Sequence, residues 1–327
     1  MDAPKRPKRP QTRANALINT VSTTRGPGIF PISLRAVSPS ILAALHWFPV
    51  RDTRKILFTA LEGCLLDADS GSWSAAQEAI DELERRSVPW VLFSGLTRAQ
   101  LDPIRRKLGH AGPFVTEHGG GLFVPQGYFP VRIEGQERSG NYQMLTLGKR
   151  CGETAAALQE LAEECGVSVA SLSQMSLHET EQNTGLPRRE AEQFRLRDFE
   201  ERFFFAGASD KAIACFVKLA RARGFYATPG QPFWSFSSVA DTGEAARRLA
   251  KLFRASAPKQ RQSQILAIGT GPEDFAMLSA ADRGILLPPE NADDDFEPPP
   301  RAPRFERAKF PGANGWAEAV LGVLVSR

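Results

Sequence analysis

Two short apolar runs with an amphipathic helical pattern between them constrain the fold of this chain more than any other feature. KILFTAL at 55–61 and PWVLFSG at 89–95 have the length and apolar character of buried strands. Between them, SAAQEAIDELERR predicts a helix with Ser74 as its N-cap and Gln77 completing a capping box. The buried face of that helix is expected to carry Ala76, Ile80 and Leu83. A strand–helix–strand unit of this length predicts parallel strands joined by a right-handed crossover.

The pattern changes in the middle of the chain and then returns. A further helix is expected over TRAQLDPIRRKLG, entered through Thr97 and Gln100. Between about 132 and 238, strand-like and helix-like segments do not alternate simply, which is typical of an α+β insert. TGEAARRLAKLF and QILAIGTGPEDFAML restore the pattern of buried helix and strand. We therefore predict an α/β fold: a doubly wound parallel-sheet core at 53–131 and 239–327, with an α+β cap domain at 132–238.

The first 52 residues differ from the rest in composition. They are rich in Pro, Arg and Ser and lack a sustained period, so we predict a basic, disordered tail. Residues 1–50 contain seven Lys or Arg and one acid, so the total charge of +4 leaves −2 for the remaining residues. A slightly acidic folded part argues against nucleic-acid binding as the main function. The tail would equally suit a transit peptide, a flexible extension or a mis-set start codon.

Neither a membrane span nor a cysteine-based site is expected. The longest apolar stretch, AVLGVLV, is too short to cross a bilayer, so we predict no membrane association. The cysteines form no C-x-x-C pair, which argues against both a zinc site and a disulfide framework. Reduced thiols are the expected state, and with them a cytoplasmic location. The four cysteines are Cys64, Cys151, Cys165 and Cys215.

Four short stretches occur in an order that resembles a known superfamily. They are FTALEGCLLD, VLFSGLTRAQL, VADTGEAARRL and AIGTGPEDFAML. Together they resemble the four loops of the haloacid-dehalogenase-like phosphatases, in the subclass that carries a large cap after the second loop. TEHGGGLFVPQGYFP, MSLHETEQNTGLPRREA and PGANGWAEAVL further resemble the mannosyl-3-phosphoglycerate phosphatase family. The resemblance spans roughly 53 to 325 and implies hydrolysis of a phosphosugar monoester.

The first two loops depart in part from the chemistry that the resemblance implies. A nucleophilic Asp is expected at the end of the first strand, where this chain has Ala60. An acid–base Asp is expected two residues later, where this chain has Glu62. The second loop keeps a hydroxyl, Ser94, followed by Gly95, and both are expected to bind a phosphoryl group. The first loop therefore lacks the nucleophilic side chain that the resemblance implies, whereas the second loop keeps the phosphate-binding hydroxyl.

The third and fourth loops are altered as well. The resemblance implies a lysine in the third loop, where this chain has Thr242. It implies G-D-x-x-N-D in the fourth loop, whereas this chain has Thr270 for the leading acid, Glu273 for the Asn, and only Asp274 in place. Mg²⁺ requires hard oxygen ligands in a near-octahedral array. We expect a weak magnesium site or none, with Glu62, Thr270 and Asp274 as its vestigial ligands. Asp274 is equally explained as an acid favoured at a helix start.

The resemblance also implies substrate-binding residues in the cap. His178, Arg197 and the Thr184–Gly185 pair lie in segments expected to bind the sugar-glycerate. The guanidinium of Arg197 suits a carboxylate or phosphate, although the solvated face of a charged helix is the commoner explanation for such a residue. His118, beside three glycines, is interpreted as structural.

These observations predict a mannosyl-3-phosphoglycerate phosphatase-like protein that has lost most or all of its hydrolytic activity. It is expected to bind a phosphosugar or a sugar-glycerate. One alternative is an active phosphatase that uses Glu62 and Asp274 in an altered mechanism. The other is a non-catalytic subunit or regulator with a protein partner, such as an active phosphatase or a glycosyltransferase.

Overall fold

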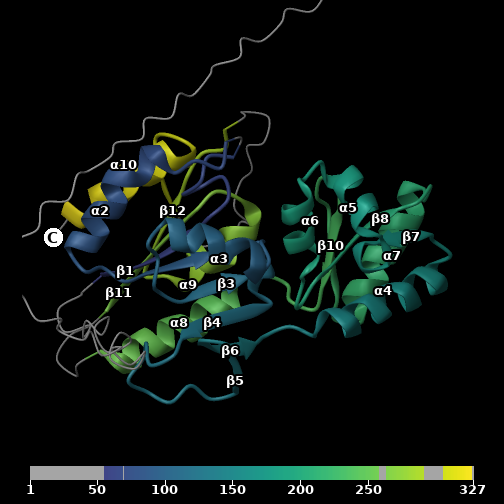
Figure 1. Cartoon of the computed structure of the whole chain (residues 1–327), viewed down its shortest axis with the longest axis horizontal. Coiled ribbons are helices and arrows are strands. Elements are labelled where there is room, and N and C mark those ends of the chain that lie inside the picture. Colours follow the sequence, from purple (N-terminus) through teal and green to yellow (C-terminus); the bar gives the residue numbers. More distant parts are fainter. Residues whose placement is uncertain (1–54, 69, 258–262, 291–304, 326–327) are drawn as a thin grey trace, which may run out of the picture. The chain divides into compact units, whose positions relative to one another are not determined.

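The computed structural model describes residues 55–68, 70–257, 263–290 and 305–325. The predicted tail at 1–52 lies outside these residues. The described residues form one large, mainly parallel sheet and a separate, smaller antiparallel sheet (Figure 1). The predicted α/β class with an added cap is confirmed. None of the helices in the described ranges combines the length and apolar character that crossing a bilayer requires.

The large sheet holds the strands that the sequence predicts as buried. Its strands run in the order β13-β12-β11-β1-β2-β3-β4-β6-β5. Pairing is parallel from β13 to β3 and antiparallel from β3 to β5. The bounds are β1 Lys55–Ala60, β2 Trp90–Phe93, β3 Phe114–Thr116, β4 Gly121–Pro125, β5 Gln136–Ser139, β6 Tyr142–Thr146, β11 Gln264–Gly269, β12 Arg283–Leu286 and β13 Glu306–Arg307.

Helices cover both faces of this sheet. The crossovers through α2 and α9 lead away from the sheet centre in opposite directions, so right-handed connections put these helices on opposite faces. Helix α10 packs beside α2, and α8 packs against α9 (Figure 1). The indole of Trp316 in α10 is fully buried and donates to the Thr59 hydroxyl of β1 at 2.7 Å. The bounds are α2 Gln77–Arg85, α3 Arg98–Lys107, α8 Gly243–Ser256, α9 Phe275–Ala280 and α10 Gly312–Val325.

One of the two predicted capping boxes is confirmed and the other is wrong. At α3, the Gln100 N–H donates to the Thr97 hydroxyl at 3.2 Å, and the Thr97 N–H donates to the Gln100 side chain at 3.1 Å. At α2, residues Ser74–Ala76 instead form a 3₁₀ turn, η1, and the α-helix begins at Gln77. The Ser74 N–H donates to the Ser72 hydroxyl at 3.2 Å. The serine whose side chain accepts an N–H at the start of this segment is therefore Ser72, two residues before the predicted N-cap.

The cap contains a four-stranded antiparallel sheet in the order β7-β8-β10-β9. Helices α4 and α7 pack together against an aromatic core that includes Phe203, Phe216 and Phe236. Helix α4 is followed by Gly166 in the left-handed conformation that suits a C-cap glycine. The bounds are α4 Cys151–Cys165, β7 Val169–Ser171, α5 Leu177–Thr184, α6 Arg188–Arg195, β8 Glu201–Phe205, α7 Asp210–Ala222, β9 Tyr226–Thr228 and β10 Trp234–Ser237.

Strands β5 and β6 hydrogen-bond onto the large sheet through β4, not onto the cap sheet. The expected division at residue 132 therefore separates these two strands from the sheet that they extend. Elements that belong to the smaller sheet and its helices start at α4.

A buried carboxylate joins the η2 turn (Glu117–Gly119), which follows β3, to the segment before β8. The Glu117 side chain accepts the backbone N–H groups of Asp198, Phe199 and Glu200 at 2.9, 2.9 and 3.0 Å. Burial raises the pKa of Glu117, while these N–H groups and the charge of Arg197 oppose that shift. The glycine run is needed here because a Cβ on Gly121 would lie 2.3 Å from the Phe199 ring.

Candidate functional site

A pocket of about 410 Å³ lies at the carboxyl ends of β1 and β2, where open α/β sheets bind ligands. Eight of the eleven residues predicted as site residues line it, from the sheet loops and from the cap. They are Ala60, Glu62, Ser94, Gly95, Thr184, Arg197, Thr242 and Asp274. The structure thus brings most of the predicted residues together around one cavity.

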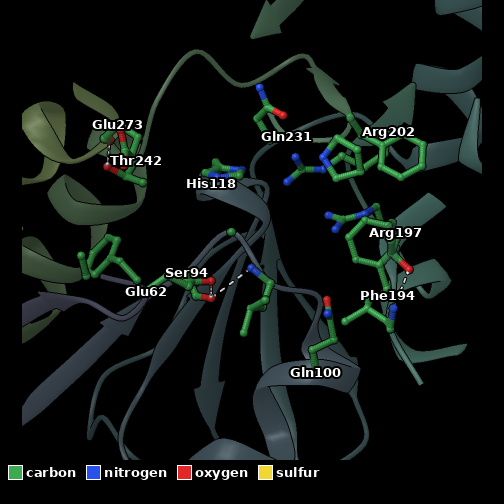
Figure 2. Close-up of a pocket in the computed structure, with 18 of the residues that line it drawn as sticks. Glu62, Ser94, Gln100, His118, Phe194, Arg197, Arg202, Gln231, Thr242 and Glu273 are labelled. Atoms are coloured by element: carbon green, nitrogen blue, oxygen red, sulfur yellow. Dashed lines mark hydrogen bonds between the residues drawn. The ribbon is translucent and has the colours of Figure 1, made fainter. Parts of the chain in front are cut away.

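The first two loops meet at a carboxylate and a hydroxyl. Ala60 ends β1 beside Phe93 of β2, and it places only a methyl group at the pocket. The Ser94 hydroxyl donates to Glu62 Oε1 at 2.7 Å and accepts the Leu96 N–H at 3.0 Å (Figure 2). Ser94 and Glu62 are therefore held in mutual contact at the edge of the cavity.

One hydrogen bond links the third loop to the fourth loop, and two more form within the fourth loop. The hydroxyl of Thr242 donates to the Glu273 carbonyl oxygen at 3.3 Å. The buried Asp274 carboxyl accepts the N–H groups of Thr270 and Gly271 at 2.8 and 3.4 Å. Burial, reinforced by the charge of Glu273, raises the pKa of Asp274 to about 7. The Asp274 carboxyl therefore forms its hydrogen bonds with the backbone of the fourth loop.

The donors present do not fit a magnesium ion. Within the described ranges, no three or more His, Cys, Asp or Glu side chains gather in an arrangement that could hold a metal. Ala60 offers no side-chain oxygen, Glu62 contacts Ser94, and Asp274 contacts backbone N–H groups. Mg²⁺ prefers several hard oxygen ligands in octahedral geometry.

Basic side chains from the cap and from the η2 turn line the pocket, and all of them contact the buried carboxylate of Glu200. Glu200 Oε1 accepts Arg202 Nη2 at 2.6 Å and also contacts Arg197 Nη1. Glu200 Oε2 contacts His118 Nδ1 at 3.0 Å and accepts the Ser235 hydroxyl at 2.8 Å. Burial opposes the charge of Glu200, but the three cationic neighbours outweigh it and hold the pKa well below its ordinary value.

The alternative explanation of Arg197, a residue on the solvated face of a charged helix, is wrong. Helix α6 ends at Arg195, and Arg197 lies in the turn before β8 with 9% of its surface exposed. Burial is tolerated because Glu200 accepts its guanidinium, which also lies 4.6 Å from the centre of the Phe194 ring. Arg197 Nε is buried and has no hydrogen-bond partner among the described residues.

His118 is the main site residue that the sequence interpretation missed. It has φ 52°, a left-handed backbone conformation, and its side chain lines the pocket. Figure 2 places its ring between Thr242 and Glu273 on one side and Arg197 and Arg202 on the other. No residue spacing in the sequence predicts that His118 lines the pocket, because its place there depends on the strand order of the sheet and on the cap. Other lining residues missed include Gln100, Phe194, Arg202, Gln231 and Phe233.

Three predicted residues do not line this pocket. The side chain of His178 is 74% exposed, and its Nδ1 lies 3.8 Å from Glu181 Oε2. Gly185 forms the left-handed C-cap of α5, and Thr270 uses its N–H to bind Asp274. Their proposed contacts with a ligand stay predictions.

Protein-family models give no match to this sequence, whereas curated relatives match over most of it. A glucosyl-3-phosphoglycerate/mannosyl-3-phosphoglycerate phosphatase of Methanococcoides burtonii is 27% identical over 273 residues, or 83% of this chain and 97% of the relative. A mannosyl-3-phosphoglycerate phosphatase of Pyrococcus furiosus is 31% identical over 208 residues, or 64% of this chain and 81% of the relative.

Solved structures agree on the fold. A haloacid dehalogenase-like hydrolase from Bacteroides thetaiotaomicron has a TM-score of 0.53 at 15% identity, covering 83% of this chain and all of that one (100%). Thermoplasma acidophilum 0175 has a TM-score of 0.57 at 16% identity, covering 84% and 100%. Likeness at such identities shows the fold, while the sequence relatives show the family. The chain has the fold of the haloacid dehalogenase-like hydrolases and belongs to the mannosyl-3-phosphoglycerate phosphatase family.

Proposed function

We propose that this protein binds a phosphorylated sugar-glycerate in the pocket and does not hydrolyse it by the aspartyl-phosphate route of its family. The observation that carries the proposal is the methyl group of Ala60 at the carboxyl end of β1, lining the cavity. A methyl group cannot attack phosphorus, so the covalent intermediate cannot form there. The names of the sequence relatives supply the ligand class.

The third loop supports the same conclusion. Thr242 lines the pocket where the family resemblance implies a lysine, and its hydroxyl already binds the Glu273 carbonyl oxygen. Phosphoryl transfer depends on positioning and charge neutralisation. Loss of one electrostatic contributor typically lowers the rate by roughly 10²–10³. The loss of both nucleophile and cation therefore leaves binding as the activity that the pocket supports best.

The purified chain is expected to bind mannosyl-3-phosphoglycerate or glucosyl-3-phosphoglycerate in calorimetry and to release no phosphate above background. Both compounds are tested with Mg²⁺, with a chelator, and beside a general phosphate ester. Phosphate release that saturates with substrate and is abolished by Glu62→Gln would contradict binding without turnover and would favour the second candidate below. Absence of any binding would contradict the ligand assignment instead.

A second candidate is direct activation of water by the remaining acids. It is favoured by Glu62 and Asp274 lining the same cavity, since attack by water needs no side-chain nucleophile. Direct attack inverts the configuration at phosphorus, whereas two successive displacements retain it. A phosphorothioate ester that is chiral at phosphorus by oxygen labelling, hydrolysed in water of a third oxygen isotope, therefore separates the mechanisms if thiophosphate is released. Retention would exclude the direct route.

A further inference from the structure

We propose that the imidazolium of His118 is the cation that binds the phosphate group in this pocket, in place of the third-loop lysine whose position Thr242 occupies. The ligand class is a phosphate monoester dianion. The inference rests on the proposed function, because it concerns the same cavity, and it assigns the positive charge that this function requires. Three independent features carry it: the position of the ring, its orientation by Glu200, and its access to the pocket.

The backbone fixes the ring beside the second loop. The N–H of His118 donates to the Ser94 carbonyl oxygen at 3.2 Å, and the N–H of Glu117 donates to the Leu96 carbonyl oxygen at 3.2 Å. The imidazole lies directly against Gly95, because a Cβ there would be 2.5 Å from His118 Nε2 and 2.6 Å from Cε1. Nε2 is thus held at the loop that carries the Ser94 hydroxyl.

The carboxylate of Glu200 orients the ring. Its Oε2 lies 3.0 Å from His118 Nδ1, which leaves Nε2 as the ring nitrogen available to the cavity. In the charged imidazole both nitrogens donate, so Nε2–H can bind a phosphoryl oxygen while Nδ1–H binds Glu200. Partial burial opposes the charge, but Glu200 outweighs it, and the pKa of His118 is raised from its ordinary value.

Access distinguishes His118 from the two arginines. The side chain of His118 is 39% exposed, whereas those of Arg202 and Arg197 are 16% and 3% exposed. Both guanidinium groups also bind Glu200. The histidine therefore presents the most accessible of the three charges that meet at this carboxylate.

The surroundings favour an anion on the same side of the pocket. Glu200 is the carboxylate that Arg197, Arg202 and His118 share, so positive charge exceeds negative charge in this set of contacts. Arg197 Nε, buried beside the pocket, adds an N–H with no partner among the described residues. The left-handed backbone of His118 is uncommon for a residue other than glycine, and such conformations cluster at functional sites.

The test measures phosphate-ester and inorganic-phosphate binding by calorimetry in the full chain and in His118→Asn. Asparagine tolerates the left-handed backbone and still donates a hydrogen bond, but carries no charge. Loss of a charge-assisted hydrogen bond is expected to weaken binding by about ten- to a hundred-fold. Lys211→Asn, which removes an exposed charge from α7 outside the pocket, is the matched control and is expected to bind like the unchanged chain.

Rescue and pH dependence separate a charge effect from a structural one. Adding Thr242→Lys to His118→Asn is expected to restore most of the lost affinity, because a cation returns to the same cavity. The unchanged chain is expected to lose affinity as pH rises through the His118 pKa, whereas the double variant holds its affinity. The charged groups that act on His118 are Glu200, Arg202 and Glu62, so all three are kept unchanged.

The outcomes are distinguishable. Equal affinity in the unchanged chain and a folded His118→Asn variant would overturn the role of His118 and leave the proposed function standing. Weaker binding without rescue by Thr242→Lys and without pH dependence would also overturn it, as the sign of a structural role. Failure of the unchanged chain to bind any phosphate compound would overturn the proposed function and this inference together.

Discussion

The triple variant Ala60→Asp, Thr242→Lys, Thr270→Asp is expected to release phosphate from mannosyl-3-phosphoglycerate at least about 10⁴-fold above the assay background, since Thr242→Lys and Thr270→Asp each restore an electrostatic contribution of roughly 10²–10³. Ala60→Asp supplies a nucleophile at the end of β1, where the alanine lines the pocket. Thr242→Lys supplies a cation at the same cavity. Phosphate release over time, in single-turnover and steady-state assays, is the measurement.

The matched control replaces only the nucleophile in the same background. Ala60→Asn with Thr242→Lys and Thr270→Asp has nearly the same shape at position 60 but carries no negative charge there, and an amide does not form an acyl phosphate. It is expected to bind the ester and to release no phosphate. A chelator is expected to return the active variant to background, because Thr270→Asp and Ala60→Asp add the hard oxygen ligands that Mg²⁺ prefers.

Two results would contradict this expectation. Equal turnover in the triple variant and the unchanged chain would mean that Ala60 does not occupy the decisive position. A triple variant that binds the ester tightly yet stays inactive would mean that the pocket has diverged beyond the substituted residues. The Thr270 backbone N–H that binds Asp274 is the first place to look for that divergence, because it holds the carboxyl against its own loop.

Local patterns predicted much of the fold. The capping box of Thr97 and Gln100 depends on a spacing of three residues, and the structure confirms it. The strand runs from Lys55 and Trp90 likewise appear as β1 and β2, because short apolar segments bury readily in a parallel sheet. The prediction failed at Ser74, where a 3₁₀ turn competes with the α-helix and a nearby serine satisfies the first N–H.

Site residues could be predicted from the sequence only where they belong to a motif that carries the family resemblance. Ala60, Glu62, Ser94 and Thr242 follow from the loop motifs, and they do line one cavity. His118 could not be found in this way, since its contacts are with Gly95 and Glu200, distant in sequence and brought close by strand order and by the cap.

The burial of Arg197 was missed for a related reason. The run from Arg188 to Arg197 is rich in charge and predicts an exposed helix, and α6 does form over most of it. The chain then turns, and Glu200 supplies the carboxylate that lets Arg197 be buried. A single fully buried acid changes the environment of two arginines and one histidine, which a periodic pattern cannot show.

Glu200→Gln is expected to lower the free energy of unfolding by about 3–5 kcal/mol, the usual cost of leaving one side of a buried charge pair without its partner. The carboxylate is fully buried and contacts Arg197, Arg202 and His118. Its removal leaves the guanidinium of Arg197, itself almost fully buried, without the carboxylate that its Nη1 contacts. Urea denaturation of the unchanged chain and the variant measures the difference.

The neighbouring carboxylate provides a matched control. Glu201 is also buried, but it accepts backbone N–H groups from Ser173 and Arg202 and its Oε2 has no partner among the described residues. Burial raises its pKa, so its charge is already disfavoured in the folded chain. Glu201→Gln is therefore expected to cost less than about 1 kcal/mol. Similar losses in both variants would refute the special role of Glu200.

The pH dependence of the Glu200→Gln effect follows from the direction of the Glu200 shift. The pKa of this carboxyl is lower in the folded chain than in the unfolded one, because the neighbouring cations outweigh the cost of burial. Its stabilising contribution is therefore fully present above the unfolded pKa of about 4.3 and declines as pH falls below that value toward the folded pKa. The stability gap between the unchanged chain and Glu200→Gln is expected to narrow as pH falls from about 5 into stronger acid. The gap is also expected to narrow as pH rises through the His118 pKa, because Glu200 raises that pKa in the folded chain. A gap that does not narrow in acid would contradict a stabilising role for the Glu200 charge.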